Sequence, residues 1–93
     1  GLIQSLSWTL KEEVQMDNTR VLSRDWSSYP ILTFSEIPPV EMVLIDRPGQ
    51  PFLGAGEASQ GPTGAALANA VFDATGVRFR TLPLTPDRVL QAL

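Results

Sequence analysis

The chain has 93 residues, 43% of them hydrophobic and 18% charged, and a formal net charge of −3. The absence of Cys and His excludes disulfides, thiolate nucleophiles, His-ligated metals and catalytic triads built on His. No cluster of Lys and Arg favours nucleic acid, and no apolar run approaches the roughly 18 residues that a membrane-spanning helix needs.

The spacing of apolar side chains predicts a first helix over residues 1–13. These side chains are Leu2, Ile3, Leu6 and Leu10, with Trp8 beside them. Two short strands follow in the prediction, Glu13–Met16 and Arg20–Ser23. They are joined at Asp17-Asn18, residue types that favour a hairpin turn.

An irregular segment from Arg24 to Val40 comes next, because its prolines prevent a long regular element. Its large apolar side chains are too many for a free linker, so we expect the segment to lie across another surface. They are Trp26, Tyr29, Ile31, Leu32 and Phe34. Val40–Asp46 (VEMVLID) is then the best strand candidate, and Pro48-Gly49 ends it.

A long Ala-rich helix is predicted from Gly61 to Thr75. Pro62 suits the start of this helix, and Gly76 suits a C-terminal cap with positive φ. Nearly every side chain between them is small or apolar, which is typical of a helix buried on all sides. A chain of this length can hardly surround such a helix alone, so we expect a C-terminal piece of a longer polypeptide.

The last predicted elements are a strand and a short helix. Val77–Leu84 alternates apolar and polar side chains, and Thr85 can cap a helix with Val89, Leu90 and Leu93 on its apolar face. The predicted fold class is therefore α+β. Its order is helix, small hairpin, irregular crossing, strand, buried helix, strand and short C-terminal helix.

Glu57 draws attention because it lies in a run of small residues, and the nearest basic residues in sequence are Arg47 and Arg78. A carboxylate is seldom buried without a partner, since desolvating its charge is costly. Residue type alone favours an exposed loop residue. The alternative is a carboxylate that faces a group supplied from outside this sequence.

Three motifs stand in order along the chain. The loop Gly54-Ala55-Gly56-Glu57 leads into a helix that contains Ala68-Asn69-Ala70, and the tail reads Leu82-Pro83-Leu84-Thr85-Pro86. In this order they resemble the end of the molybdopterin-binding large subunit of the xanthine dehydrogenase and aldehyde oxidase family. The loop sequence from Gly56 to Thr63 is similar to the bacterial branch of the family that is named for isoquinoline 1-oxidoreductase and its beta chain.

This resemblance implies that residues 1–93 are a C-terminal fragment of a molybdopterin-binding domain in an oxidoreductase. In the family, a glutamate beside the molybdenum centre acts as the general base, and Glu57 occupies the matching position. The enzymes hydroxylate an electron-poor carbon of an aldehyde or N-heteroaromatic ring with oxygen derived from water. Such a base must be ionised near neutral pH and within hydrogen-bond reach of the proton it removes.

Cofactor contacts are implied for residues around this glutamate, since glycine lets a backbone approach a bulky group and helix N-termini attract anionic oxygens. The candidates are Gly56, Ala58, Ser59 and Gln60. Gln4 is a further candidate, because Gly1-Leu2-Ile3-Gln4 is similar to a helix start in the family. The sequence departs from the family at Ser5, where Gly commonly follows that Gln.

The resemblance also implies partners. They are the remainder of the large subunit, an iron–sulfur small subunit and a small aldehyde or N-heterocycle substrate. We expect the molybdopterin cofactor to be held by the complete protein, and the isolated chain to bind no metal and to be inactive. No residue encodes a compartment, and the resemblance slightly favours the periplasm over the cytoplasm.

A second hypothesis is a non-catalytic binding or assembly module whose apolar helix packs on a partner. It accounts for the Ala-rich helix and the aromatic crossing, but gives no reason for a Gly-x-Gly-Glu loop directly before that helix. Other polar and aromatic residues have structural interpretations. Asn69 is expected to be hydrogen-bonded, Glu12 and Glu13 with Lys11 to form a solvated face, and Trp8, Trp26 and Tyr29 to pack.

Overall fold

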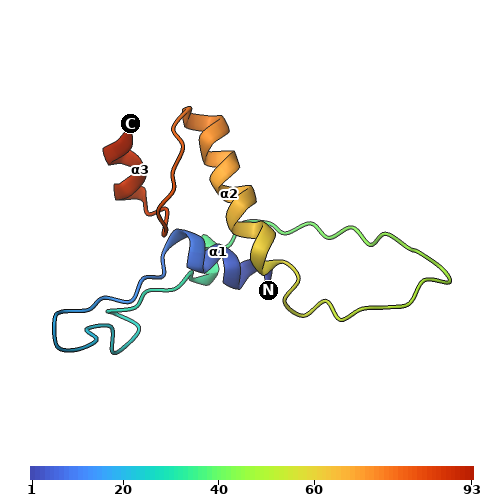
Figure 1. The fold of residues 1–93 in the computed structure, drawn as a ribbon, viewed down its shortest axis with the longest axis horizontal. Helices are drawn as coiled ribbons and strands as arrows, with labels where there is room; N and C mark the ends of the chain where they lie inside the picture. Colours follow the sequence, from blue (N-terminus) through green and yellow to red (C-terminus); the bar gives the residue numbers. More distant parts are fainter.

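The computed structural model describes residues 1–93 and contains three α-helices, one short 3-10 helix and long irregular connections (Figure 1). The elements are α1 (Leu2–Leu10), η1 (Phe34–Glu36), α2 (Gln60–Thr75) and α3 (Pro86–Ala92). The three predicted helices are therefore confirmed in their order. The only strand-like pairing is an isolated antiparallel bridge between Met16 and Val21.

α1 and α2 pack against each other, and this is the main contact between elements of the structure. Ser5 and Thr9 of α1 are buried, and a Cβ added to Gly64 of α2 would lie 3.4 Å from Thr9 Oγ1. The Ser5 and Thr9 hydroxyls donate to the carbonyl oxygens of Gly1 (2.8 Å) and Ser5 (2.7 Å), one turn earlier. Small side chains with internally satisfied hydroxyls thus let the two helices approach closely.

The apolar side chains that predicted α1 do not become its buried side. Leu2 and Ile3 remain 42% and 41% exposed, while the buried positions are all small and polar. The helix also ends at Leu10, before residue 13, because Lys11 leaves the helical conformation with φ at −134°. The helix was predicted correctly, although the spacing of its apolar residues does not mark the side that is buried.

α2 is mostly exposed, which agrees with the expectation that a chain of this length cannot surround the Ala-rich helix alone. Thr63 is its only buried residue, and only 6 of the 93 residues are buried in the whole molecule. The helix begins at Gln60, which puts Pro62 within the first turn, where its missing N–H is not needed. Gly76 ends the helix with φ at 74°, as predicted.

Neither predicted strand forms, and the α+β class is not confirmed. Val40–Asp46 is extended but pairs with no neighbour, and Val77–Leu84 connects α2 to α3 without a β-ladder. A strand needs an adjacent strand to complete its backbone hydrogen bonds, and this chain supplies none. One bond does tie the second segment to α1, from Leu84 N to Thr9 O at 2.6 Å.

In place of the predicted hairpin of two short strands, the chain forms a turn closed by the single bridge between Met16 and Val21. Asp17 Oδ1 accepts hydrogen bonds from the backbone N–H groups of Thr19 (2.7 Å) and Arg20 (2.9 Å). These bonds hold the pKa of the Asp17 carboxyl below its usual range. The turn depends only on hydrogen bonds between neighbouring residues, so the sequence could predict it. A longer β-ladder is stable only when one face of it packs on another part of the protein.

The irregular crossing lies against α1, as predicted. Leu32 N donates to Ser7 Oγ at 3.0 Å, and Tyr29 Oη donates to Glu12 Oε2 at 2.8 Å. The carboxylate of Glu12 also raises the pKa of the Tyr29 hydroxyl. Trp26 is 74% exposed, so its interpretation as a packing residue is wrong.

The acidic residues after α1 are not a merely solvated face. Glu13 accepts two hydrogen bonds from Arg88 Nη2 (2.7 and 2.9 Å), which lower the pKa of its carboxyl. Lys11 pairs with Glu36 of η1. These contacts attach α3 and η1 to the N-terminal part of the chain. Thr85 caps α3 by accepting from Arg88 N at 3.3 Å, as predicted.

Candidate functional site

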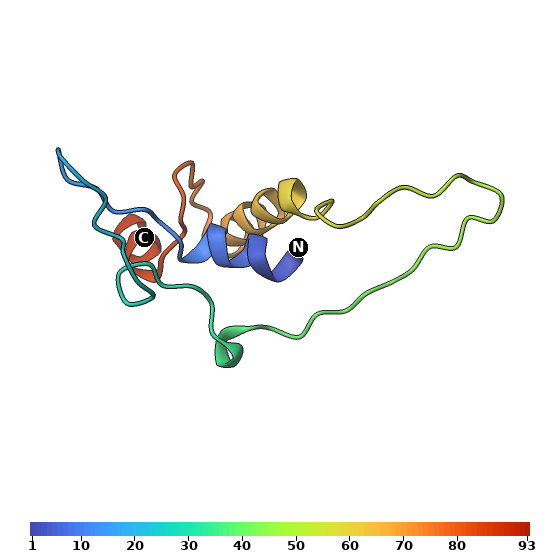
Figure 2. The same ribbon diagram turned by 90° about the horizontal axis from the view of Figure 1, so that it is seen from below.

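The start of α1 touches the Gly-x-Gly-Glu loop that precedes α2. A Cβ added to Gly1 would lie 2.6 Å from Ser59 Oγ, 3.2 Å from Gly56 O and 4.0 Å from Glu57 Cα. Figure 2 shows the N-terminus of the chain beside the first turn of α2. The packing of α1 on α2 therefore brings together two motifs from distant parts of the sequence.

Glu57 is exposed, and its carboxylate accepts one hydrogen bond, from Gln60 at the start of α2. Its Oε1 accepts a hydrogen bond from Gln60 Nε2 at 3.2 Å, and its backbone oxygen accepts from Gln60 N at 3.1 Å. It takes part in none of the ion pairs, which join Lys11 to Glu36, Arg20 to Asp17 and Arg88 to Glu13. The second oxygen, Oε2, accepts no hydrogen bond from this chain.

The glycines of the loop are not required by the chain itself. Only Gly49 and Gly76 have positive φ, so the backbone conformation does not require glycine at positions 54 and 56. A Cβ added to either loop glycine would meet no atom within 4 Å. Neither backbone conformation nor packing within this chain requires glycine at these two positions, and the space beside them is open. The loop therefore fits a bulky cofactor beside Glu57.

The other residues predicted to contact the cofactor lie in two places, directly before α2 and on α1. Ala58 is exposed and Ser59 half-buried directly before α2, where Ser59 is the N-cap residue but makes no side-chain capping bond. Gln4 is exposed one turn along α1 and lines a hollow of about 320 Å³ with Trp8 and Trp26. The structure thus brings Gly56, Glu57 and Ser59 to the start of α1 but does not bring the Gln4 side chain to them.

Ser5, which departs from the family pattern, is the most buried side chain of the chain at 2% exposure. Its hydroxyl bonds to the Gly1 carbonyl oxygen within α1. Its position is that of a helix-packing residue.

Asn69 has the hydrogen bond that was expected of it, although it is exposed. Its Oδ1 accepts from Arg78 Nη1 at 2.7 Å, and the Arg78 guanidinium lies 3.8 Å from the centre of the Phe72 ring. This cluster joins the last turns of α2 to the segment that follows it. Asn69 is structural, and the Ala-Asn-Ala motif needs no ligand to explain it.

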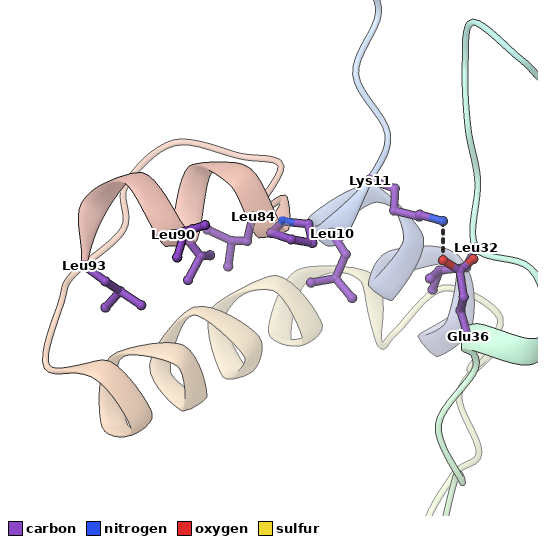
Figure 3. Close-up of a pocket in the computed structure, with 9 residues that line it drawn as sticks. Leu10, Lys11, Leu32, Glu36, Leu84, Leu90 and Leu93 are labelled. Carbon is purple, nitrogen blue, oxygen red and sulfur yellow. Dashed lines mark hydrogen bonds and ion pairs between the residues drawn. The ribbon is translucent and has the colours of Figure 1, made fainter.

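Another hollow of the molecule lies away from the Glu57 loop and was not predicted. It is a groove of about 630 Å³ between the end of α1, η1 and α3. Figure 3 shows leucines from α1, the segment before α3, and α3 lining it, with the Lys11–Glu36 pair at one end. Lys11 and the Thr33 backbone N–H lower the pKa of Glu36 to about 2. None of its lining residues belongs to the Glu57 loop.

The sequence predicted the apolar face of the last helix, which forms one wall of this groove. It did not predict that Leu10 lies opposite that face. No group of three Asp, Glu, His or Cys side chains is arranged to hold a metal ion. None of the helices has the length and apolar character needed to cross a membrane.

Comparisons with known proteins give relatives along the whole chain, although no protein-family model matches it. The chain is 49% identical over all 93 residues to a nicotinate dehydrogenase polypeptide of Pseudomonas putida, of which it spans 8%. It is 33% identical over 100 aligned positions to the aldehyde oxidoreductase molybdenum-binding subunit PaoC of Escherichia coli, covering 100% of the chain and 14% of that protein.

The beta chain of isoquinoline 1-oxidoreductase from Brevundimonas diminuta is 33% identical over 92% of the chain, which spans 11% of it. The chain is related to the C-terminal region of the molybdenum-binding subunits of the xanthine dehydrogenase and aldehyde oxidase family. The family predicted from the loop, helix and tail motifs is thereby confirmed, with isoquinoline 1-oxidoreductase among its members.

The chain spans only a small part of these family members, 8% of the first and 14% of PaoC. One further relative, 32% identical over 95% of the chain, has a different cofactor in its name. It is the membrane-bound aldehyde dehydrogenase (pyrroloquinoline-quinone) of Gluconacetobacter polyoxogenes.

Proposed function

We propose that the chain is the C-terminal part of a molybdenum hydroxylase large subunit and that Glu57 is its general base. The observation that carries this proposal is the setting of Glu57. It is an exposed carboxylate in no ion pair, preceded by two glycines that the chain's own packing does not require. The family relationship supplies the chemistry for which such a carboxylate is suited.

The residues of the loop have distinct tasks in this proposal. Glu57 accepts a proton at Oε2, while Gln60 Nε2 holds Oε1 and fixes the orientation of the carboxylate. Gly54 and Gly56 would let the backbone lie against the cofactor, and the N-terminus of α2 would help to hold its anionic groups. The molybdopterin group, when bound, supplies the redox centre and activates the oxygen derived from water.

The rest of the enzyme is proposed from the family. Nicotinate dehydrogenase and isoquinoline 1-oxidoreductase have the names of N-heterocycles and PaoC that of an aldehyde oxidoreductase, so an N-heterocycle or aldehyde is the proposed substrate class. The remainder of the large subunit would complete the molybdopterin-binding domain. It would also cover α2 and pair with the extended segments that are unpaired in this chain. An iron–sulfur small subunit is the proposed electron acceptor.

The test is the substitution Glu57→Gln in the complete enzyme, which keeps the shape of the side chain and removes the base. We expect kcat to fall about 10²- to 10⁴-fold, the usual contribution of a general base, with the molybdenum content unchanged. Asp87→Asn is the control, because Asp87 is also an exposed carboxylate in no ion pair and lies outside the loop, in α3. A kcat within a few-fold of the parent enzyme would reject the role of Glu57.

The cofactor is identified by chemical analysis of the same purified enzyme. Molybdenum and pyrroloquinoline quinone are both measured in the purified enzyme, since one relative is named for the quinone. We expect molybdenum in amounts near one per large subunit and no quinone. Quinone without molybdenum would contradict the proposed chemistry whatever the effect of Glu57→Gln.

A non-catalytic assembly module is the second candidate, favoured by the many large apolar side chains that remain exposed. In that case Glu57→Gln would leave every activity unchanged. Charged substitutions on the apolar surface would instead prevent assembly with the partner.

A further inference from the structure

A long arm, residues 38–53, extends from the body of the protein between η1 and the Glu57 loop. Figure 2 shows it as an open excursion with no other segment beside it, and it sets the 54 Å length of the molecule. Its two extended limbs are joined by a turn at Arg47–Gln50, where Gln50 N donates to Arg47 O at 3.2 Å. Pro48 and Gly49, with φ at 77°, give this turn its type II geometry.

The side chains of the arm are unsuited to water. Seven large apolar residues are all at least half exposed, and Phe52 reaches 98%. They are Val40, Met42, Val43, Leu44, Ile45, Phe52 and Leu53. Consecutive apolar residues from Met42 to Ile45 point alternately to both sides of an extended chain, so both faces of the limb require cover.

The backbone of the arm is equally open. Apart from the Gln50–Arg47 bond within the turn, no backbone hydrogen bond involves residues 38–53. Unpaired N–H and C=O groups along a β-branched, apolar segment are a template for another strand. The arm thus lacks both a neighbour at its edge and a layer on each face.

Two arguments identify what covers it. A second copy of this chain could pair with the edge, but it has the same bare faces and no sheet to offer. The large subunits to which the chain is related are far longer, since the chain spans 8% of its nicotinate dehydrogenase relative. That additional polypeptide is large enough to cover two faces and an edge together, and in the proposed subunit it is joined to this chain.

We propose that the limb Val40–Asp46 adds as a strand to a β-sheet formed by the rest of the same large subunit, with apolar layers on both of its faces. This inference rests on the proposed place of the chain in a longer subunit, but not on the role of Glu57. The arm then fastens the polypeptide directly before the Glu57 loop to the body of the enzyme.

Hydrogen exchange of the complete enzyme, followed by mass spectrometry of its peptides, tests the proposal. We expect the amides of residues 41–46 to exchange on the order of 100-fold more slowly than those of the Arg47–Gln50 turn, as in paired strands. Exchange as fast as in the turn would overturn the proposal. Protection lost on dilution would point to a second copy, and protection lost without the small subunit would point to that subunit. Either result would also overturn it.

Substitutions at the centre of the limb give an independent measurement. We expect Val43→Asp to reduce the yield of soluble large subunit at least about tenfold, because a charge would be buried without a partner. Val43→Ile, which conserves shape, and Gln50→Asp in the turn are the controls and should keep the yield. A normal yield of Val43→Asp would contradict the buried strand.

The two proposals fail separately. If Glu57→Gln remains active while residues 41–46 are protected, the base is wrongly assigned and the strand stands. If the limb exchanges freely while Glu57→Gln loses kcat, the strand is wrong and the base stands.

Discussion

Two regions of this chain differ in how they are held. Residues 1–36 and 60–93 are joined by contacts from distant parts of the sequence, such as Leu84 N to Thr9 O and Arg88 to Glu13. Residues 38–58 form only two backbone hydrogen bonds outside regular structure, and both are local. One region is a scaffold that the chain builds alone, and the other is shaped by polypeptide that lies elsewhere. Glu57 stands at the junction, directly before the first turn of α2.

The largest loss of stability is expected from a substitution at the contact between α1 and α2. We expect Gly64→Leu to cost about 1–3 kcal/mol, because its Cβ alone would lie 3.4 Å from Thr9 Oγ1 and the larger side chain must separate the helices. The measurement is the thermal unfolding midpoint of the complete subunit.

Gly61→Ala is the matched control for this substitution. It lies on the same helix, but a Cβ there would meet no atom within 4 Å. Its effect should be neutral or stabilising by less than about 1 kcal/mol, as helix propensity predicts. Equal destabilisation by both variants would show that the contact with Thr9 is not what holds the helices together.

A smaller effect on stability is expected at two glycines that share the same backbone conformation, one in each region. Gly49 in the arm and Gly76 at the end of α2 have φ values of 77° and 74°, and neither has an atom near an added Cβ. An Ala in this conformation costs about 1–2 kcal/mol if the surroundings hold the backbone there. We expect Gly76→Ala to show this cost in the unfolding midpoint of the subunit.

Gly49→Ala then reports on the arm. If the arm is fastened as a strand in the complete subunit, its turn is held and the cost should equal that of Gly76→Ala. If the arm is free, the turn relaxes and the substitution has little effect. A silent Gly49→Ala beside a destabilising Gly76→Ala would therefore contradict the proposed strand.

The sequence predicted those parts of the fold that depend on neighbours in the chain. The Gly76 cap, the Thr85 cap and the Asp17 turn are each decided within four residues, and all three were correct. Strand pairing at Val40–Asp46 was not decided in this way, because a ladder needs a partner that the chain lacks. Helices could be located, but the sheet could not.

The candidate site shows the same division. The loop and Glu57 were identified from residue types and resemblance, and their surroundings were not. The contact of Gly1 with Ser59 depends on α1 packing through Ser5 and Thr9, polar residues that periodicity assigns to a solvent side. Hydroxyls that bond to their own helix can be buried at little cost, and a hydrophobic pattern does not reveal them.

The smallest predicted effect concerns the ion pair that fastens η1 to the end of α1. Lys11 first, and then the Thr33 N–H, lower the pKa of Glu36 from 4.5 to about 2. Since the folded state lowers this pKa, the pair stabilises the fold fully above about pH 5, and the stabilisation is lost as the pH falls toward 2. Glu36→Gln should remove this part of the acid sensitivity of the unfolding midpoint and lower the midpoint near pH 7 by the same small amount, because both side chains are partly exposed and water screens their attraction. Arg20→Gln is the control. The Arg20–Asp17 pair is more exposed than the Lys11–Glu36 pair, and the pKa of Asp17 is lowered mainly by hydrogen bonds from Thr19, so this variant should keep the acid sensitivity of the parent. An acid sensitivity that is identical in the parent and in Glu36→Gln would show that η1 is held by packing of its neighbours and not by this pair.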